Sequence, residues 1–164
     1  MRFSLSFLIF AATAIGAMVD ATYETIPGHD CLRSMKGMME SMIYLADAHP
    51  DLVSIIKIGE SYLKNNDGPA AYSEYDVPTG GHDIFALNVT ASDGPASSGS
   101  KGRFLITSGV HAREYAPPEL LARFVEELVN GYGVYAEITT ILQRTEIHAI
   151  LYVNPDGRWM AVSC

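Results

Sequence analysis

The sequence has little cysteine, little tryptophan and a deficit of positive charge. Two cysteines and one tryptophan occur in 164 residues, and 11 lysines and arginines stand against 19 aspartates and glutamates. Cys31 and Cys164 allow at most one disulfide, and the terminal position of Cys164 leaves that pairing open. The formal net charge of −8 argues against binding to nucleic acid or to an anionic membrane surface. With 18% charged and 48% hydrophobic residues, the composition is that of a globular chain.

A short apolar stretch follows the basic start of the chain. It covers residues 3–17, ends in small residues and is followed by polar sequence. Such a stretch is short for a membrane span and is typical of a secretory signal peptide, although an uncleaved anchor is the alternative. Cleavage after Ala17 and cleavage after Ala21 both fit the pattern. We therefore expect a secreted, extracellular protein with a signal peptide at 1–21 and one domain at 22–164.

Residues 88–90 read Asn-Val-Thr, which is an acceptor sequence for N-glycosylation. On a secreted chain this predicts a glycan at Asn88. Such triplets are also common by chance, and an asparagine buried in a strand would not be modified.

The hydrophobic pattern predicts strands that alternate with helices. A helix capped by Asp30 and stopped by Pro50 is followed by strands at 52–59, 83–91 and 103–110, helices at 117–130 and 136–145, and a strand that runs from 146 into a turn at 154–157. This alternation indicates an α/β sheet with helices on its faces. The unbroken apolar run at 103–110 predicts a central strand buried on both faces. The helix at 117–130 is expected to bury Leu121, Phe124, Val125 and Leu128.

His111 and Glu114 stand where the strand at 103–110 gives way to the next helix. In open α/β sheets, ligands collect at the carboxyl ends of the strands, and two side chains three residues apart across a bend can point into one cavity. Imidazole and carboxylate are good zinc ligands, and a catalytic zinc typically takes three protein ligands and a water. The pair is therefore a candidate for two of three ligands. A surface histidine beside a glutamate that favours the helix N-terminus is the alternative.

Three segments resemble the M14 family of zinc metallocarboxypeptidases. They are residues 49–62, residues 109–129 and residues 150–158, and they occur in the order found in the family. The resemblance implies a zinc carboxypeptidase-like α/β fold with a mixed, largely parallel sheet and helices on both faces. It implies that His111 and Glu114 are the first two zinc ligands, that Arg113 contacts the substrate, and that Asn154 to Gly157 form a structural turn.

The chain departs from the family pattern downstream of this pair. The third zinc ligand of the family is a later histidine, and the catalytic glutamate lies further along. His148 is the one later histidine here, and it falls inside a predicted strand, where a core role is the usual one. We therefore expect zinc as the cofactor and peptides or proteins with a free C-terminus as substrates. We assign no catalytic residue, and we expect this chain alone to be inactive.

The sequence leaves three interpretations open. The chain is the N-terminal part of a secreted metallocarboxypeptidase, or a non-catalytic secreted remnant that binds peptides or a protein partner, or a globular protein with a chance motif.

Overall fold

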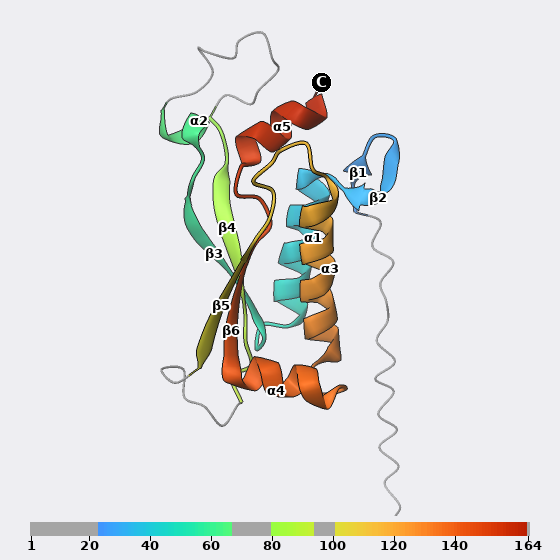
Figure 1. Cartoon of the computed structure of the whole chain (residues 1–164), viewed down its shortest axis with the longest axis vertical. Coiled ribbons are helices and arrows are strands. Elements are labelled where there is room, and N and C mark those ends of the chain that lie inside the picture. Colours follow the sequence, from blue (N-terminus) through green and yellow to red (C-terminus); the bar gives the residue numbers. More distant parts are fainter. Residues whose placement is uncertain (1–22, 67–79, 94–100, 164) are drawn as a thin grey trace, which may run out of the picture.

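The computed structural model describes residues 23–66, 80–93 and 101–163. Their elements are β1 (Thr25–Ile26), β2 (His29–Arg33), α1 (Met35–Ala48), β3 (Val53–Glu60), α2 (Tyr62–Asn65), β4 (Asp83–Val89), β5 (Gly102–Thr107), α3 (Ala116–Gly131), α4 (Ala136–Arg144), β6 (Thr145–Ile150) and α5 (Pro155–Ser163) (Figure 1). The expected signal peptide and Cys164 lie outside the described residues. Within them, no helix is both long and apolar enough to cross a bilayer.

The main sheet has the strand order β3-β4-β6-β5. The β5–β6 pair is parallel because α3 and α4 carry the chain back to the end of the sheet at which β5 begins, so that β6 starts beside the start of β5. The β3–β4 and β4–β6 pairs are antiparallel. The predicted mixed α/β sheet is confirmed. The expectation of a largely parallel sheet is wrong for the described residues, where two of the three strand pairs of the main sheet are antiparallel.

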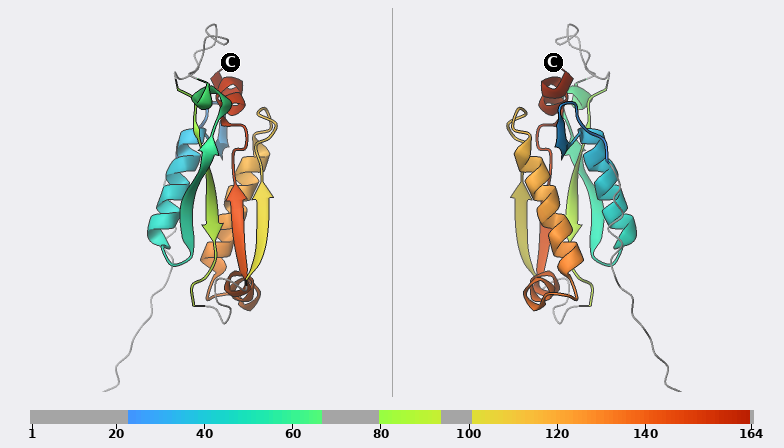
Figure 2. Two further views of the ribbon diagram at one scale, coloured as in Figure 1. Left: turned by 90° about the vertical axis from the view of Figure 1, so that its left-hand side faces the viewer. Right: turned by 90° about the vertical axis from the view of Figure 1, so that its right-hand side faces the viewer.

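The long helices α1 and α3 lie on the same face of this sheet (Figure 2). Helices on both faces were expected, and the described residues do not bear this out. The opposite face carries Ile56, Ile58 and Leu105, which are 40%, 49% and 61% exposed. Their strand neighbours Ile55 and Ile106 point the other way and pack on the core. The sheet therefore has one covered face and one face open to solvent in the part of the chain that is described.

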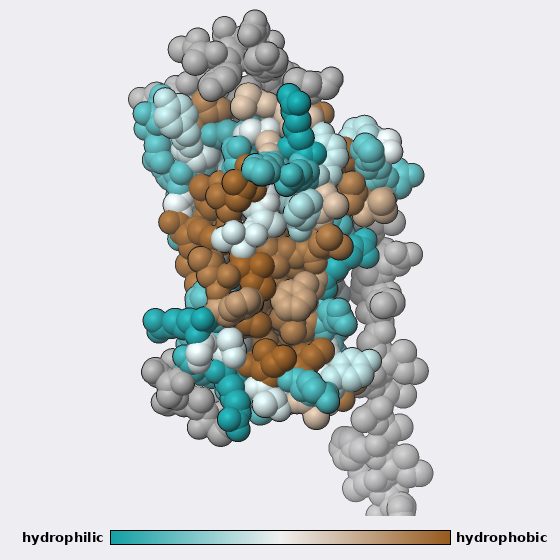
Figure 3. All heavy atoms as spheres, in the orientation of Figure 1, coloured by the Kyte–Doolittle hydropathy of each residue, from teal (hydrophilic) through white to brown (hydrophobic). Residues whose placement is uncertain are grey.

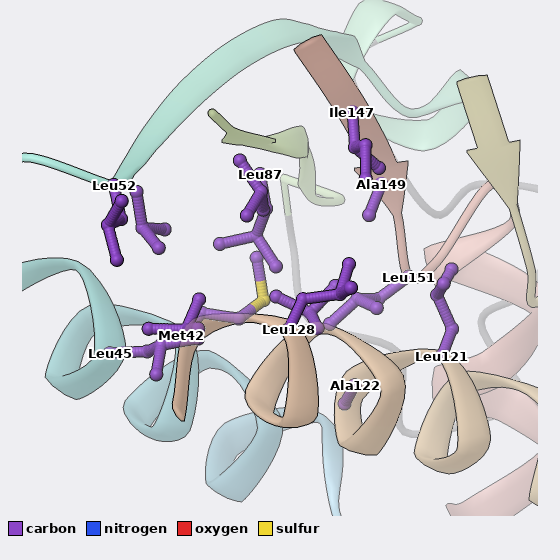
Figure 4. Close-up of a cluster of buried hydrophobic side chains, with 14 of the residues drawn as sticks. Met42, Leu45, Leu52, Leu87, Leu121, Ala122, Leu128, Ile147, Ala149 and Leu151 are labelled. Carbon is purple, nitrogen blue, oxygen red and sulfur yellow. The ribbon is translucent and has the colours of Figure 1, made fainter. Parts of the chain in front are cut away.

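The hydrophobic core lies between this covered face and the two long helices. Figure 4 shows side chains from α1 and α3 meeting those of β4, β6 and the segment after β6. Its best-buried members include Met38, Leu87, Val125, Leu142 and Leu151, none more than 1% exposed. Burial of this many apolar side chains is the main force that holds the helices on the sheet.

The edge strand β5 and the outer side of α3 form an exposed apolar margin. Phe104 of β5 is 56% exposed and Phe124 of α3 is 42% exposed. Figure 3 shows hydrophobic side chains gathered on the side of the molecule where β5 and α3 face the viewer. The prediction that Phe124 is buried is wrong, and so is the prediction that residues 103–110 form a central strand. The Phe124 prediction came from helical spacing alone, and β5 is an edge strand of the sheet in the described residues.

Helix α1 begins later than the sequence pattern predicts. Ser34, and not Asp30, is its N-cap, and the Ser34 hydroxyl accepts a hydrogen bond of 3.1 Å from the backbone N–H of Gly37. Residues 29–33 form the short strand β2 instead. Both residues are good caps in sequence, so the choice was made by the pairing of β2 with β1.

A buried ion pair joins β2 to the first turn of α3. The Arg33 guanidinium donates to both carboxylate oxygens of Glu119 at 3.0 to 3.2 Å, and the Arg33 backbone N–H adds a bond of 3.1 Å. Both side chains are under a tenth exposed. Arg123 and Glu126 extend the network along α3. The contact fixes the position of the N-terminal end of α3, close in sequence to Glu114.

Candidate metal centre

His111 and Glu114 lie at the two ends of a tight turn between β5 and α3. The backbone N–H of Glu114 donates to the carbonyl of His111 at 3.2 Å, which closes a four-residue turn. The turn brings the side chains together, with 3.1 Å between His111 Nδ1 and Glu114 Oε1. The two side chains therefore lie on the same side of the backbone, as expected, but they meet at the surface and not in a cavity. The structure also places the pair beyond the carboxyl end of β5, as predicted, although β5 is an edge strand.

The segment that leads into this turn is fixed to the chain that follows β6. The Ser108 hydroxyl donates to the carbonyl of Leu151 at 2.6 Å, and the Ser108 carbonyl accepts from the N–H of Val153 at 3.1 Å. Gly109 has a φ of +65°, and a Cβ at this position would lie 2.8 Å from the carbonyl oxygen of Leu151. Glycine is therefore required by both its backbone angle and the close approach of the two segments.

Residues 154–157, expected as a turn, form the start of α5. The Asn154 side-chain oxygen accepts from the backbone N–H of Gly157 at 3.0 Å, as an N-cap does. The Asn154 backbone N–H donates to the carbonyl of Gly109 at 3.1 Å. Buried Asp156 accepts from the N–H of Leu63 at 2.9 Å. The segment therefore holds the approach to the His111–Glu114 turn, which agrees with a structural and non-catalytic role.

Arg158 and Tyr115 complete the support of this turn, and the sequence pattern did not single them out. Arg158 is 2% exposed, and its guanidinium donates to the carbonyl of Ala112 at 3.2 Å. Its guanidinium carbon lies 4.0 Å from the ring centroid of Tyr115. The Tyr115 hydroxyl donates to the carbonyl of Ala161 at 2.7 Å. No sequence signal pointed to Arg158, because arginine side chains are usually solvated.

The metal-ligand candidates are open to solvent. The side chains of His111 and Glu114 are 75% and 57% exposed, and Arg113 is exposed as well. A pocket of about 400 Å³ in the described residues lies elsewhere. Its lining includes Met35, Met39, Met42, Phe85 and Trp159. The pair therefore lies on a surface, reachable by an ion and by a peptide, and not inside this pocket.

The donor set fits zinc as part of a site. A histidine nitrogen and a carboxylate oxygen 3.1 Å apart are two of the ligands that zinc prefers. Among the described residues, no group of three or more histidine, cysteine, aspartate or glutamate side chains is arranged to hold a metal. His148 lies within β6, opposite Asn88 and Leu105. The described residues therefore offer two ligands and no third.

Asn88 and Cys31 lie apart from the turn. Asn88 lies in β4, with strands paired on both sides, and its side-chain oxygen is buried without a hydrogen-bond partner. The hydroxyl of Thr90 donates to the carbonyl of Thr145 at 3.0 Å. This position weighs against a glycan on the folded domain, and the glycosylation itself stays a prediction. Cys31 is exposed and forms no disulfide within the described residues.

The family model for the zinc carboxypeptidases matches residues 38–163. The chain belongs to the zinc carboxypeptidase family. Its relatives include a zinc carboxypeptidase of Saccharothrix mutabilis, 30% identical over 109 residues, and carboxypeptidase B2 of Homo sapiens, 25% identical over 114 residues. These alignments cover 66% and 70% of this chain but 21% and 22% of the relatives. Both relatives are carboxypeptidases, which are hydrolases, and this chain spans about a fifth of their length.

Solved carboxypeptidase structures share the fold of this family member. The carboxypeptidase A of Helicoverpa armigera superposes with a TM-score of 0.58 at 18% identity, over 78% of this chain and 26% of that chain. The crystal structure of thrombin activatable fibrinolysis inhibitor gives a TM-score of 0.60 at 24% identity, over 77% and 26%. At these identities the likeness establishes the fold.

Proposed function

We propose that this chain provides the first part of the active site of a secreted zinc metallocarboxypeptidase, an enzyme that removes C-terminal amino acids from peptides and proteins. The observation that carries the proposal is the 3.1 Å contact of His111 and Glu114 in a turn inside the region matched by the family model. In this proposal the two side chains are zinc ligands and Arg113, exposed between them in sequence, contacts the substrate.

In this proposal the metal and the side chains of this chain have different roles in catalysis. Zinc held at this turn would polarise the scissile carbonyl and lower the pKa of a bound water. His111 and Glu114 contribute ligand atoms, and the positive charge of Arg113 can attract an oxygen of the substrate. The described residues bring no third metal ligand to this turn, and we assign no residue as the general base.

Secretion is part of the proposal. It is supported by the basic start, the apolar stretch and the small residues within positions 1–21. The mature protein should begin near Met18 or Thr22. N-terminal sequencing of secreted material that starts at Met1 would exclude cleavage.

A non-catalytic role is the second candidate, and one relative favours it. An inactive metallocarboxypeptidase of Saccharomyces cerevisiae is 31% identical over 77 residues, which is 47% of this chain and 18% of that protein. In this alternative the exposed face around Arg113 binds peptides or a protein partner without cleaving them.

Two assays on the 164-residue chain separate the candidates. We expect release of C-terminal residues from a peptide panel, with zinc added, to be lower than that of a complete enzyme by several orders of magnitude. A missing base alone costs roughly 10²–10⁴-fold. Robust turnover that is lost with a chelator and in His111→Ala would show instead that the chain assembles a complete site. Binding of peptides with a free C-terminus, but not of amidated ones, and no zinc uptake would favour the non-catalytic role.

A further inference from the structure

We propose that Arg158 is a positioning residue that sets the shape of the 111–114 turn and so the separation of the two ligand side chains. The inference deepens the proposed function and rests on it for the role of the metal. The physical basis is a set of contacts between α5 and the turn, which lie 46 residues apart in sequence.

The first contact is made inside the turn. Arg158 donates through Nη1 to the carbonyl of Ala112, the residue that follows His111, at 3.2 Å. Ala112 forms one of the two corners of the turn that the Glu114 N–H closes onto the His111 carbonyl. A donor fixed on this carbonyl limits rotation of the peptide plane between Ala112 and Arg113. Without this donor the turn would open more readily, and an open turn would let the side chains of His111 and Glu114 move apart.

The second contact is made directly after the turn. The Arg158 guanidinium lies over the ring of Tyr115, with 4.0 Å from its central carbon to the ring centroid. A second ring, that of Tyr152, lies 5.8 Å away. Tyr115 in turn donates to the carbonyl of Ala161 on α5 at 2.7 Å. One side chain therefore contacts the residues on both sides of the segment that holds Glu114, through a backbone carbonyl before it and a ring after it.

The burial of this cation is the reason to give it more than a packing role. Arg158 is 2% exposed, and no carboxylate of the described residues forms an ion pair with it. Burial lowers the pKa of the Arg158 guanidinium, because removal from water disfavours the charged form. An apolar side chain would fill the same space without this cost. The carbonyl of Ala112 and the face of Tyr115 are what the guanidinium can bind and an apolar side chain cannot.

The first experiment needs no metal. In the 164-residue chain, hydrogen exchange of the Glu114 amide is measured by NMR for the wild type, Arg158→Met, Arg158→Lys and the control Arg103→Met. Arg103 is exposed and pairs with Glu146, away from the turn. We expect exchange about tenfold faster in Arg158→Met, an intermediate rate in Arg158→Lys because its ammonium can still reach the Ala112 carbonyl, and no change in the control.

The second experiment measures zinc binding by His111 and Glu114. Zinc is titrated into the same four proteins while the imidazole nitrogen signals of His111 are followed. We expect the zinc affinity of Arg158→Met to be about tenfold weaker than that of the wild type, in line with the loss of other residues that orient ligands. The amides outside residues 108–115 and α5 should keep their chemical shifts, which separates positioning from a general loss of structure.

The two experiments can refute the metal site and the positioning role of Arg158 independently of each other. If the wild type shows no zinc-dependent shift of His111, but Arg158→Met still exchanges Glu114 faster, the metal site is refuted and the positioning role stands. Equal exchange in wild type and Arg158→Met overturns the positioning role. If Arg158→Met does not fold, Tyr115→Leu removes the ring beneath the guanidinium and should accelerate exchange of Glu114 several-fold; an unchanged rate there also overturns the inference.

Discussion

Gly109 lies where the strand end approaches the chain after β6, and its missing side chain lets the two segments touch. The backbone there is held on both sides, by Ser108 to Leu151 and by Asn154 to Gly109. The neighbouring turn keeps His111 and Glu114 within contact of each other. At the residue scale, the candidate site is therefore a short loop whose shape is set by backbone contacts.

We expect Gly109→Ala to destabilise the fold by about 3 kcal/mol, because a positive φ is strained for alanine and its Cβ would meet the Leu151 carbonyl. Gly133→Ala is the matched control. Gly133 has a φ of +74°, but a Cβ there would have no neighbouring atom within 4 Å, so this variant should lose only about 1 kcal/mol. Urea unfolding of both variants measures the difference. An equal loss of unfolding free energy in the two variants would show that the close approach at Gly109 does not affect stability.

The sequence offered His111 and Glu114 as a candidate pair because side chains three residues apart across a strand-to-helix bend can point the same way, and the resemblance to the zinc carboxypeptidases supported that assignment. It missed Arg158 and Tyr115, since their contacts join segments 43 to 46 residues apart and no local pattern encodes such distances. Phe124 was misassigned for a related reason. Helical spacing predicts which face of a helix is apolar, but it does not predict how much of that face the sheet covers.

At the scale of elements, helix α3 connects the candidate site to the rest of the domain. Its first turn holds Glu119, which is 4% exposed and bound to Arg33 of β2. Burial acts to raise the pKa of the Glu119 carboxyl, but the hydrogen bonds from Arg33 outweigh it and hold this pKa below its usual 4.5. The charged form is therefore favoured by folding. Its contribution to stability is complete above about pH 4.5 and is lost as the pH falls through the lower folded-state pKa.

We expect Glu119→Gln to lower the free energy of unfolding by about 3 kcal/mol at pH 7, because it leaves the buried Arg33 without its main partner. The loss should shrink below about pH 4.5, because the carboxyl of the unfolded wild type takes up a proton there before the folded one does, which reduces the contribution of the ion pair. Unfolding in urea at pH 7 and at pH 3 tests this. Glu40→Gln, on the exposed face of α1, should change stability by less than about 0.5 kcal/mol at either pH. A loss in Glu119→Gln that is the same at both pH values would refute the assignment.

The succession of elements was largely readable from the sequence, since buried strands and amphipathic helices have different periods. Element starts were less readable. Both Asp30 and Ser34 are suitable caps, and the pairing of β2 with β1 decided between them. The direction of the strands could not be predicted from the local sequence either, because the apolar pattern of β4 is compatible with a parallel or an antiparallel pairing with β3.

At the scale of the whole molecule, the described residues form a layer of helices on a layer of sheet with one sheet face exposed. The unpaired edge of β5 lies beside Phe104 and Leu105, both more than half exposed. Open edges and apolar faces of this kind promote association between molecules. The association that this exposed edge promotes can therefore be measured in solution.

We expect the 164-residue chain to associate in a concentration-dependent way, and Leu105→Lys to reduce this by placing a charge on the edge strand. Sedimentation velocity over a tenfold range of concentration measures the effect. The control Ile43→Lys changes a side chain that is 46% exposed on α1, away from the sheet edge, and should reduce association less. Association that responds equally to both variants would show that the sheet edge is not its cause.

Calorimetric titration of zinc into the 164-residue chain tests whether the His111–Glu114 turn binds the metal. We predict a single weak site, because two protein ligands bind zinc less tightly than three. That site should be lost in His111→Ala and in Glu114→Gln and kept in His49→Ala, which removes a histidine at the end of α1. Zinc binding of unchanged affinity in His111→Ala would contradict the assignment of this turn as part of a carboxypeptidase metal centre.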